Sequence, residues 1–229
     1  MPGRKSIGRK LNYEWNFWFL WEYRALIFIG VLTTVGFAVG TTILGLMVGV
    51  VIGLGRLLGG TWLRLPLTGF VELFRCTPLL VQLVWLYYAL PVLSGLQISA
   101  WVAATLALTF YASSFFAEIF RGGVTSIDAG QWDGARAIGM RRLQILRRII
   151  LPQAFRNMLP AIMNQSVMQL KNTSLVSTVA VADLLYQGSI ITAATYRPLE
   201  VYTLVAVLYF LILFPLTRLS SQLEKWLVR

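Results

Sequence analysis

Long apolar runs alternate with short polar segments along most of the 229-residue chain. Five of these runs approach or exceed the roughly 20 residues that an α-helix needs to cross the hydrocarbon core of a bilayer. They cover residues 25–55, 67–92, 100–120, 160–185 and 200–217. The pattern predicts an all-α membrane protein with five transmembrane helices in one domain, residues 25–229.

Two predicted spans contain residues that disturb a continuous apolar helix. Pro78 lies inside the second span, and its missing N–H predicts a kink or a break there. Pro91 and Gly95 mark a short turn after that span. The fourth span contains Lys171 among several amides and hydroxyls, so it is the most polar of the five.

Seven aromatic residues crowd the segment NYEWNFWFLWEYR at 12–24. Trp and Tyr favour the headgroup region of a membrane. Residues 1–24 are therefore expected to form an N-terminal interfacial segment, with a helix that lies in the membrane surface. Alternatively, these aromatics form the end of a long first span, and the residues leave both possibilities open.

The segment between the third and fourth spans, residues 121–158, contains seven arginines. Its first part, 130–138, has the spacing of a short helix, which Gly139 can end at little steric cost. Three residues are expected to share one apolar face of this helix: Trp132, Ala135 and Ile138.

A second amphipathic helix is expected from Arg141 to Ile150, before Pro152 and Pro160 return the chain to the membrane. Its apolar residues are Leu143, Leu146 and Ile150. Such a helix pair suits docking into a groove of a soluble partner. It equally suits anchoring to anionic membrane lipid through its arginines.

The distribution of basic residues predicts the orientation. Arg and Lys number seven at 121–158, two at 56–65 and three after 217, whereas the loops 91–99 and 186–199 contain only Arg197. Because cytoplasmic loops carry the excess of Lys and Arg, the long loop and the C-terminus are expected in the cytoplasm and the N-terminus outside. The net charge of +11 is then explained by orientation in a cell membrane, without nucleic acid. The basic residues before the first span oppose this orientation: Arg4, Lys5, Arg9, Lys10 and Arg24.

Several kinds of chemistry are excluded by residues that the sequence lacks. It has no histidine and one cysteine, Cys76, so it has no imidazole base, histidine ligand or CxxC metal site. No span has paired carboxylates, and the GxxxxGK[ST] phosphate loop is missing. We therefore expect no catalytic residue, metal or cofactor in this chain.

The basic loop resembles the signature loop of ABC-importer permeases, in which E-A-A is followed after three residues by G and after nine more by I-x-L-P. The corresponding residues here are Asp133, Gly134 and Ala135, then Gly139, then Ile149, Ile150, Leu151 and Pro152. Asp and Gly replace the usual Glu and Ala. Four further strings extend the resemblance over nearly the whole chain: ELFRCTPLLVQL at 72–83, FFAEIFRGGVTSIDAGQ at 115–131, ILPQAFRNMLP at 150–160 and LKNTSLVSTVAVADLL at 170–185.

The resemblance is closest to permeases for polar amino acids of the histidine, glutamine and glutamate type. It implies a five-span subunit with its N-terminus outside, paired with a second permease as a homodimer or heterodimer. It also implies two ATP-binding subunits, which hold ATP and Mg, and an extracytoplasmic amino-acid-binding protein. The short helix would be the coupling helix that contacts the ATPase, through Trp132, Asp133, Gly134, Ala135, Arg136 and Gly139.

Polar groups within a span are costly in lipid and indicate a functional path. Lys171 is expected to pair with a substrate carboxylate, or else with backbone carbonyls or Asp183. The spans offer no carboxylate near their middle, which favours an acidic or neutral polar amino acid over a basic one. The predicted path consists of polar residues of the third and fourth spans: Ser113, Ser114, Gln165, Ser166, Gln169, Lys171 and Asn172.

Two carboxylates each precede an arginine by three residues, Glu72 before Arg75 and Glu118 before Arg121, which suits ion pairs within a helix. Together with Pro78, these residues are expected to form either a gate of the transport path or a structural scaffold, and the scaffold role is favoured. The alternatives to an ATP-driven importer are a channel or a membrane scaffold without ATP coupling, and a secondary carrier, which usually has more spans and an internal repeat.

Overall fold

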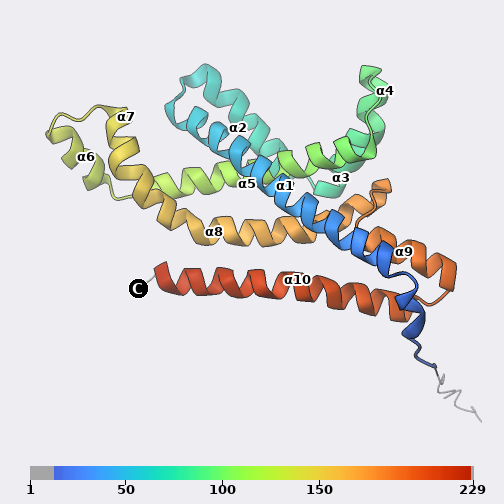
Figure 1. Ribbon diagram of the computed structural model, residues 1–229. Coiled ribbons are helices and arrows are strands. Elements are labelled where there is room, and N and C mark those ends of the chain that lie inside the picture. The colour runs from blue at the N-terminus through green and yellow to red at the C-terminus, as the bar shows by residue number, and fades with distance from the viewer. Residues whose placement is uncertain (1–12, 228–229) are drawn as a thin grey trace, which may run out of the picture.

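The computed structural model describes residues 13–227, and every regular element in that range is a helix (Figure 1). The α-helices are α1 (Arg24–Leu58), α2 (Thr61–Cys76), α3 (Leu79–Val84), α4 (Leu90–Ser94), α5 (Ala100–Thr125), α6 (Ala129–Ala137), α7 (Arg142–Ile145), α8 (Leu151–Asn172), α9 (Leu184–Thr195) and α10 (Pro198–Leu227). The 3-10 helices are η1 (Trp18–Trp21) and η4 (Thr173–Val179), and the π-helical turns are η2 (Trp85–Ala89) and η3 (Leu146–Ile150).

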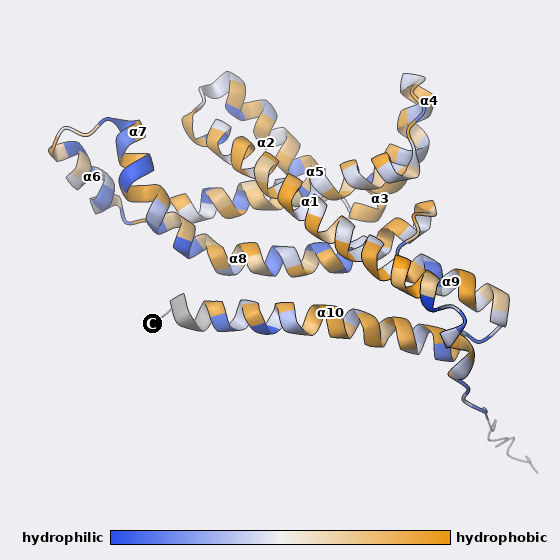
Figure 2. Cartoon of the chain, viewed as in Figure 1, coloured by the Kyte–Doolittle hydropathy of each residue, from blue (hydrophilic) through white to orange (hydrophobic). Residues whose placement is uncertain are grey.

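The helices α1, α5 and α10 are long and apolar enough to cross a membrane alone. Two bent pairs of helices bring the number of spans to five if each pair crosses once, in agreement with the sequence prediction. Figure 2 shows hydrophobic residues along most of α1 and α10. The helices α6 and α7 lie at the same end of the molecule as the end of α10, whereas η1 and α9 lie at the opposite end (Figure 1).

The centre of the bundle is the packing of α1 against α5. Gly45, Gly49 and Gly53 of α1 let the two backbones approach, because a Cβ atom at any of them would lie 2.5 or 2.6 Å from a side-chain atom of α5. Small residues at helical spacing permit this close approach in lipid, where dispersion contacts replace the hydrophobic effect between helices. The helix α8 then packs on α5, α1 and α10.

The kink predicted at Pro78 is confirmed. The pair formed by Thr61–Cys76 and Leu79–Ser94 bends by 108°. Gln82 bridges the break: its Nε2 donates to the carbonyls of Phe74 at 2.8 Å and Thr77 at 3.0 Å. The prediction of a loop at 56–65 is wrong, however. Helix α1 runs to Leu58 and α2 begins at Thr61, so only Gly59 and Gly60 lie between them.

The long loop expected at 121–158 is also mostly helical. The third span continues as α5 to Thr125. The second amphipathic helix is not a separate piece, since α7, η3 and α8 run on without a break and form the start of the fourth span. Leu146 and Ile150 are buried in this packing while Leu143 is exposed. Pro152 is the second residue of α8 and directly follows the π-helical turn η3, where the regular α-helical hydrogen bonding of the continuous helix is already interrupted.

The fourth span is broken after η4, where Ala180 adopts a left-handed conformation with φ of 59°. Asp183 then caps α9 by accepting the backbone N–H of Tyr186 at 2.8 Å. The expected loop at 186–199 is therefore replaced by α9 and the start of α10.

Of the two forms expected for residues 12–24, the end of a long first span is not found, and the helix expected ahead of that span is the short helix η1. Residues 13–17 lack regular structure, η1 has four residues and α1 begins at Arg24. The buried carboxylate of Glu200 holds this segment on the start of α10, since it accepts hydrogen bonds from the Tyr13 hydroxyl and, at 3.2 Å, from the backbone N–H of Asn16. The bond to Glu200 raises the pKa of the Tyr13 phenol and keeps it a donor. Arg4, Lys5, Arg9 and Lys10 lie outside the described residues.

Candidate functional site

The predicted short helix between the third and fourth spans is α6, whose two ends are fixed by hydrogen bonds. At its start, the carboxylate of Asp128 accepts the amide of Gly130 at 2.7 Å. At its end, the backbone N–H of Met140 donates to the carbonyl of Ala135 at 3.1 Å, and the backbone N–H of Gly139 donates to the carbonyl of Arg136 at 2.9 Å. This pair of bonds defines a Schellman motif and requires the left-handed φ of 79° at Gly139.

The helix α6 has an inner and an outer face. Ala135 is buried and Trp132 is half-buried against the core cluster that contains Ile145, Leu146 and Ile150. Asp133, Gly134 and Arg136 point away from the protein, and the Asp133–Arg136 pair at 3.1 Å is exposed. Ile138 does not share the inner face, contrary to the sequence prediction: it follows the last turn of α6 and is 77% exposed.

The predicted path residues of α5 do not line an open passage within this chain. Ser113 and Ser114 are fully buried, and their hydroxyls donate to the carbonyls of Phe110 at 2.9 Å and Tyr111 at 2.7 Å. Such i−3 bonds satisfy the hydroxyls within their own helix. Ser166 of α8 behaves similarly, since it donates to Ile162 at 2.8 Å.

Gln169 is a helix-joining residue. It is fully buried, and its Nε2 donates to the hydroxyl of Thr41 on α1 at 2.8 Å and to the carbonyl of Leu108 on α5 at 3.0 Å. The face predicted from Gln165, Gln169 and Asn172 thus points into the bundle rather than into a cavity. Among the described residues, Gln165 Nε2, Gln169 Oε1 and Asn172 Nδ2 are buried side-chain atoms with no hydrogen-bond partner.

Lys171 lies on a different, exposed face of α8. The alternative pairing with Asp183 is not found: within the described range Lys171 makes no ion pair, and Asp183 accepts hydrogen bonds from Tyr186 N–H and, at 3.3 Å, from the Tyr209 hydroxyl. The exposed residues at spacings of three or four that share this face are Asn157, Ala161, Asn164, Met168 and Lys171. We call them the α8 stripe.

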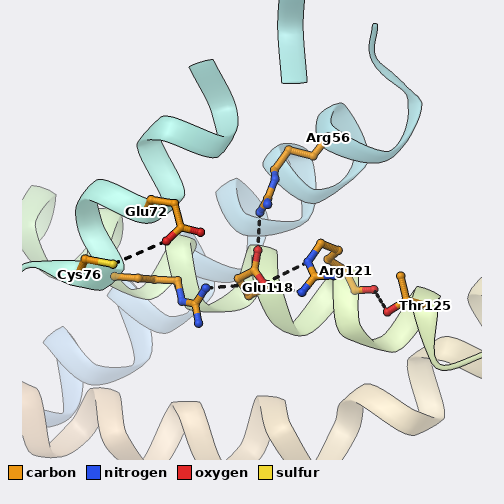
Figure 3. A network of polar contacts seen from close by, with 7 residues as sticks. Arg56, Glu72, Cys76, Glu118, Arg121 and Thr125 are labelled. Atoms are coloured by element: carbon orange, nitrogen blue, oxygen red, sulfur yellow. Dashed lines mark hydrogen bonds and ion pairs between the residues drawn. The ribbon is translucent and has the colours of Figure 1, made fainter. Parts of the chain in front are cut away.

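Glu118 is the centre of a charged cluster that joins three helices (Figure 3). Its carboxylate binds Arg121 of the same helix at 2.9 Å, Arg56 of α1 at 2.5 Å and Arg75 of α2 at 3.6 Å. The Glu118–Arg121 pair was expected from spacing. The Glu72–Arg75 pair does not form, because Arg75 reaches Glu118 instead, while Cys76 Sγ lies 3.6 Å from Glu72.

Sequence reasoning missed Arg56, which forms the shortest of these contacts. Its partner lies 62 residues away, and only the packing of α1 on α5 brings the two together. The available signal was Arg56 itself, a charge at the end of the long apolar run of α1.

Comparison with known proteins decides the family. A profile described as the inner membrane component of binding-protein-dependent transport systems matches residues 42–229. The chain belongs to this family. Its members are multi-pass inner-membrane permeases, which implies that ATP-binding subunits and a substrate-binding protein complete the transporter.

Among curated relatives, the octopine transport system permease protein of Rhizobium meliloti is 36% identical over 90% of this chain and 87% of its own length. The glutamine transport system permease protein of Escherichia coli is 34% identical over 94% of this chain and 98% of its own. The permease also resembles a chain from the crystal structure of an amino acid ABC transporter with histidines, at 33% identity and a TM-score of 0.87, over 93% of this chain and 99% of that one.

A methionine ABC transporter solved in inward-facing conformations matches the permease at 22% identity and a TM-score of 0.62, over 91% of this chain and 99% of that one. This second likeness shows the fold alone. The profile match includes α6 and the Glu118 cluster and begins within α1, so these features lie inside the family domain.

Proposed function

We propose that this permease is the membrane subunit of an ATP-driven importer that moves an acidic or neutral polar amino acid, such as glutamate, aspartate or glutamine, delivered by an external binding protein. The observation that carries the proposal is α6, a short helix with a polar outer face at one end of a bundle of membrane spans. Its fixed ends suit a rigid element that transmits force to a separate ATPase subunit. The names of the relatives for octopine and glutamine support an amino acid as cargo.

In this proposal α6 contacts the ATP-binding subunit through Asp133, Gly134, Arg136 and the Gly139 corner. Trp132 and Ala135 hold the helix on the permease, since their side chains pack inward. Nucleotide and Mg bind to the ATPase, because the permease sequence lacks a phosphate loop. The α6 end and the C-terminus then face the cytoplasm and the N-terminus faces outside, as the charge distribution favours.

The amino acid path is assigned to the α8 stripe. Asn157 and Asn164 each form a hydrogen bond with a serine at 3.0 Å, whereas Lys171 facing lipid would be costly. A second permease subunit, identical or related, is therefore proposed to cover the stripe and enclose a polar path. Three carboxylates of the described spans are not free for a cationic substrate: Asp183 and Glu200 are fully buried, and Glu118 is bound by three arginines. Glu72 is exposed, but it lies near the end of α2 and away from the α8 stripe in sequence. Lys171 is exposed and suits a substrate carboxylate.

The test is transport by the purified permease reconstituted in liposomes with candidate ATP-binding subunits and a binding protein. ATP-dependent uptake of labelled glutamine or glutamate is expected to exceed that of arginine. Uptake that needs no ATPase would show a channel and contradict the coupling role of α6. Uptake of arginine alone would contradict the substrate assignment while leaving the importer intact.

A further inference from the structure

An apolar crevice of about 270 Å³ lies between α1, α5 and α8. Every side chain that lines it is apolar. The lining includes Val50 of α1, Ile119 of α5 and four residues of α8, namely Leu151, Phe155, Met158 and Ile162. Because Phe155 is 54% exposed, the crevice is open beside α8. In a bilayer such an opening is occupied by hydrocarbon.

Exposed arginines stand immediately beside this opening. Arg147 and Arg148 lie in η3, just before Leu151. Arg147, Leu151 and Phe155 follow one another at intervals of four residues, so they lie along one side of the continuous helix. Figure 2 shows hydrophilic residues around α7 giving way to hydrophobic residues where α8 begins.

No carboxylate partner is found for these two arginines among the side chains that the structure describes. Among residues 13–223, neither Arg147 nor Arg148 forms an ion pair, whereas Arg56, Arg75 and Arg121 are all bound to Glu118. A guanidinium in this position offers several donors to a phosphate, which it binds in bidentate geometry.

The crevice lies on a different side of α8 from the α8 stripe. Leu151, Phe155 and Ile162 recur at helical intervals on one face, and Asn157, Asn164 and Lys171 recur on another. A second permease subunit that covers the stripe therefore leaves the crevice facing lipid.

We propose that this crevice is a binding site for one anionic phospholipid, whose acyl chain fills the space between α1, α5 and α8 and whose phosphate lies against Arg147 and Arg148. An apolar chain and an anionic headgroup at the membrane surface match an apolar crevice with two free cations at its mouth. The lipid would brace the junction from which α6 extends.

The test uses the permease purified with its ATP-binding subunits, and native mass spectrometry to count bound lipids. Phosphatidylglycerol and phosphatidylcholine with the same acyl chains are the probes. One phosphatidylglycerol per permease chain is expected to bind before further lipids do. Phosphatidylcholine is not expected to show such a first, tighter binding step. In the double variant Arg147→Gln/Arg148→Gln its affinity is expected to fall roughly tenfold or more, because each basic side chain near an anionic headgroup contributes separately.

Two matched controls separate this site from general attraction. Arg64→Gln/Arg218→Gln removes the same charge from exposed positions elsewhere and is expected to keep the bound lipid. Val50→Trp fills the crevice and is expected to expel the lipid, whereas Val39→Trp on an exposed part of α1 is not. Equal binding of both lipids, or equal loss in both double variants, would overturn the proposal. So would loss of the ATP-binding subunits with lipid binding unchanged, because the arginines would then belong to a protein interface.

Discussion

Arg56 and Glu118 join the end of α1 to α5 through a 2.5 Å contact, although they are 62 residues apart. Both side chains are largely shielded from solvent, at 11% and 15% exposure. Glu118→Gln would leave Arg56, Arg75 and Arg121 clustered without a carboxylate. We expect a loss of unfolding free energy of about 3 kcal/mol, the cost of removing one partner from a buried ion pair.

The measurement is thermal unfolding of the detergent-solubilised permease. Arg121→Gln is the control, since that side chain is 52% exposed and an exposed pair contributes at most about 1 kcal/mol. Equal melting temperatures for Glu118→Gln and the parent protein would show that the cluster is not a scaffold.

The end of α6 depends on Gly139, because its φ of 79° is unfavourable for any residue with a Cβ atom. Gly139→Ala meets no neighbouring atom within 4 Å, so its cost arises from the backbone alone, at about 1–2 kcal/mol. We expect the corner to shift and co-purification of the ATP-binding subunits to weaken, with membrane insertion intact.

Gly134→Ala is the matched control for that variant. Gly134 lies inside α6 with open space around it, so alanine should favour the helix. The substitution also restores the Ala of the family signature, and association with the ATPase should be kept. If Gly139→Ala retained the ATPase as well as Gly134→Ala does, the Gly139 corner would not be part of the contact.

Substitution of Lys171 is expected to affect transport without affecting the stability of the fold. Its side chain is exposed, so Lys171→Gln should change the unfolding free energy by no more than about 0.5 kcal/mol. If the lysine binds the substrate carboxylate, the KM for uptake should rise roughly tenfold or more, since hydrogen bonds to charged groups are the strong ones. Lys171→Arg keeps the charge and should retain most of the uptake. Unchanged uptake in Lys171→Gln would remove this residue from the path.

Local features of the fold were predictable because they depend on neighbours in sequence. The break at Pro78 and the stop at Gly139 follow from backbone geometry that a single residue sets. The polar residues of α8 were recognised as unusual, yet their periodicity alone could not tell which would pack inward. Gln169 faces Thr41 and Leu108 because of how α8 docks on α1 and α5, a tertiary relation that spacing does not contain.

Two errors in the element boundaries have a common cause. The segment Arg141–Ile150 was expected to be a surface helix, and residues 186–199 were expected to be a loop, because each was interpreted by charge or polarity. In the structure the first continues into α8 through η3, and the second is α9 capped by Asp183. Helix continuity here depends on capping and burial, and the arginines simply remain on the exposed side.

The close contact between α1 and α5 depends on Gly49. A Cβ atom at Gly49 would lie 2.6 Å from the Cβ of Phe116 and 2.8 Å from the carbonyl oxygen of Ser113, and neither backbone can yield without separating the helices. Gly49→Ala should therefore destabilise the permease by about 2 kcal/mol, the usual cost of overpacking a dense contact. Gly40→Ala, on the same helix with nothing within 4 Å, should be neutral or slightly stabilising. Thermal unfolding of the two variants side by side decides the matter: equal melting temperatures would mean that α1 and α5 do not pack through Gly49.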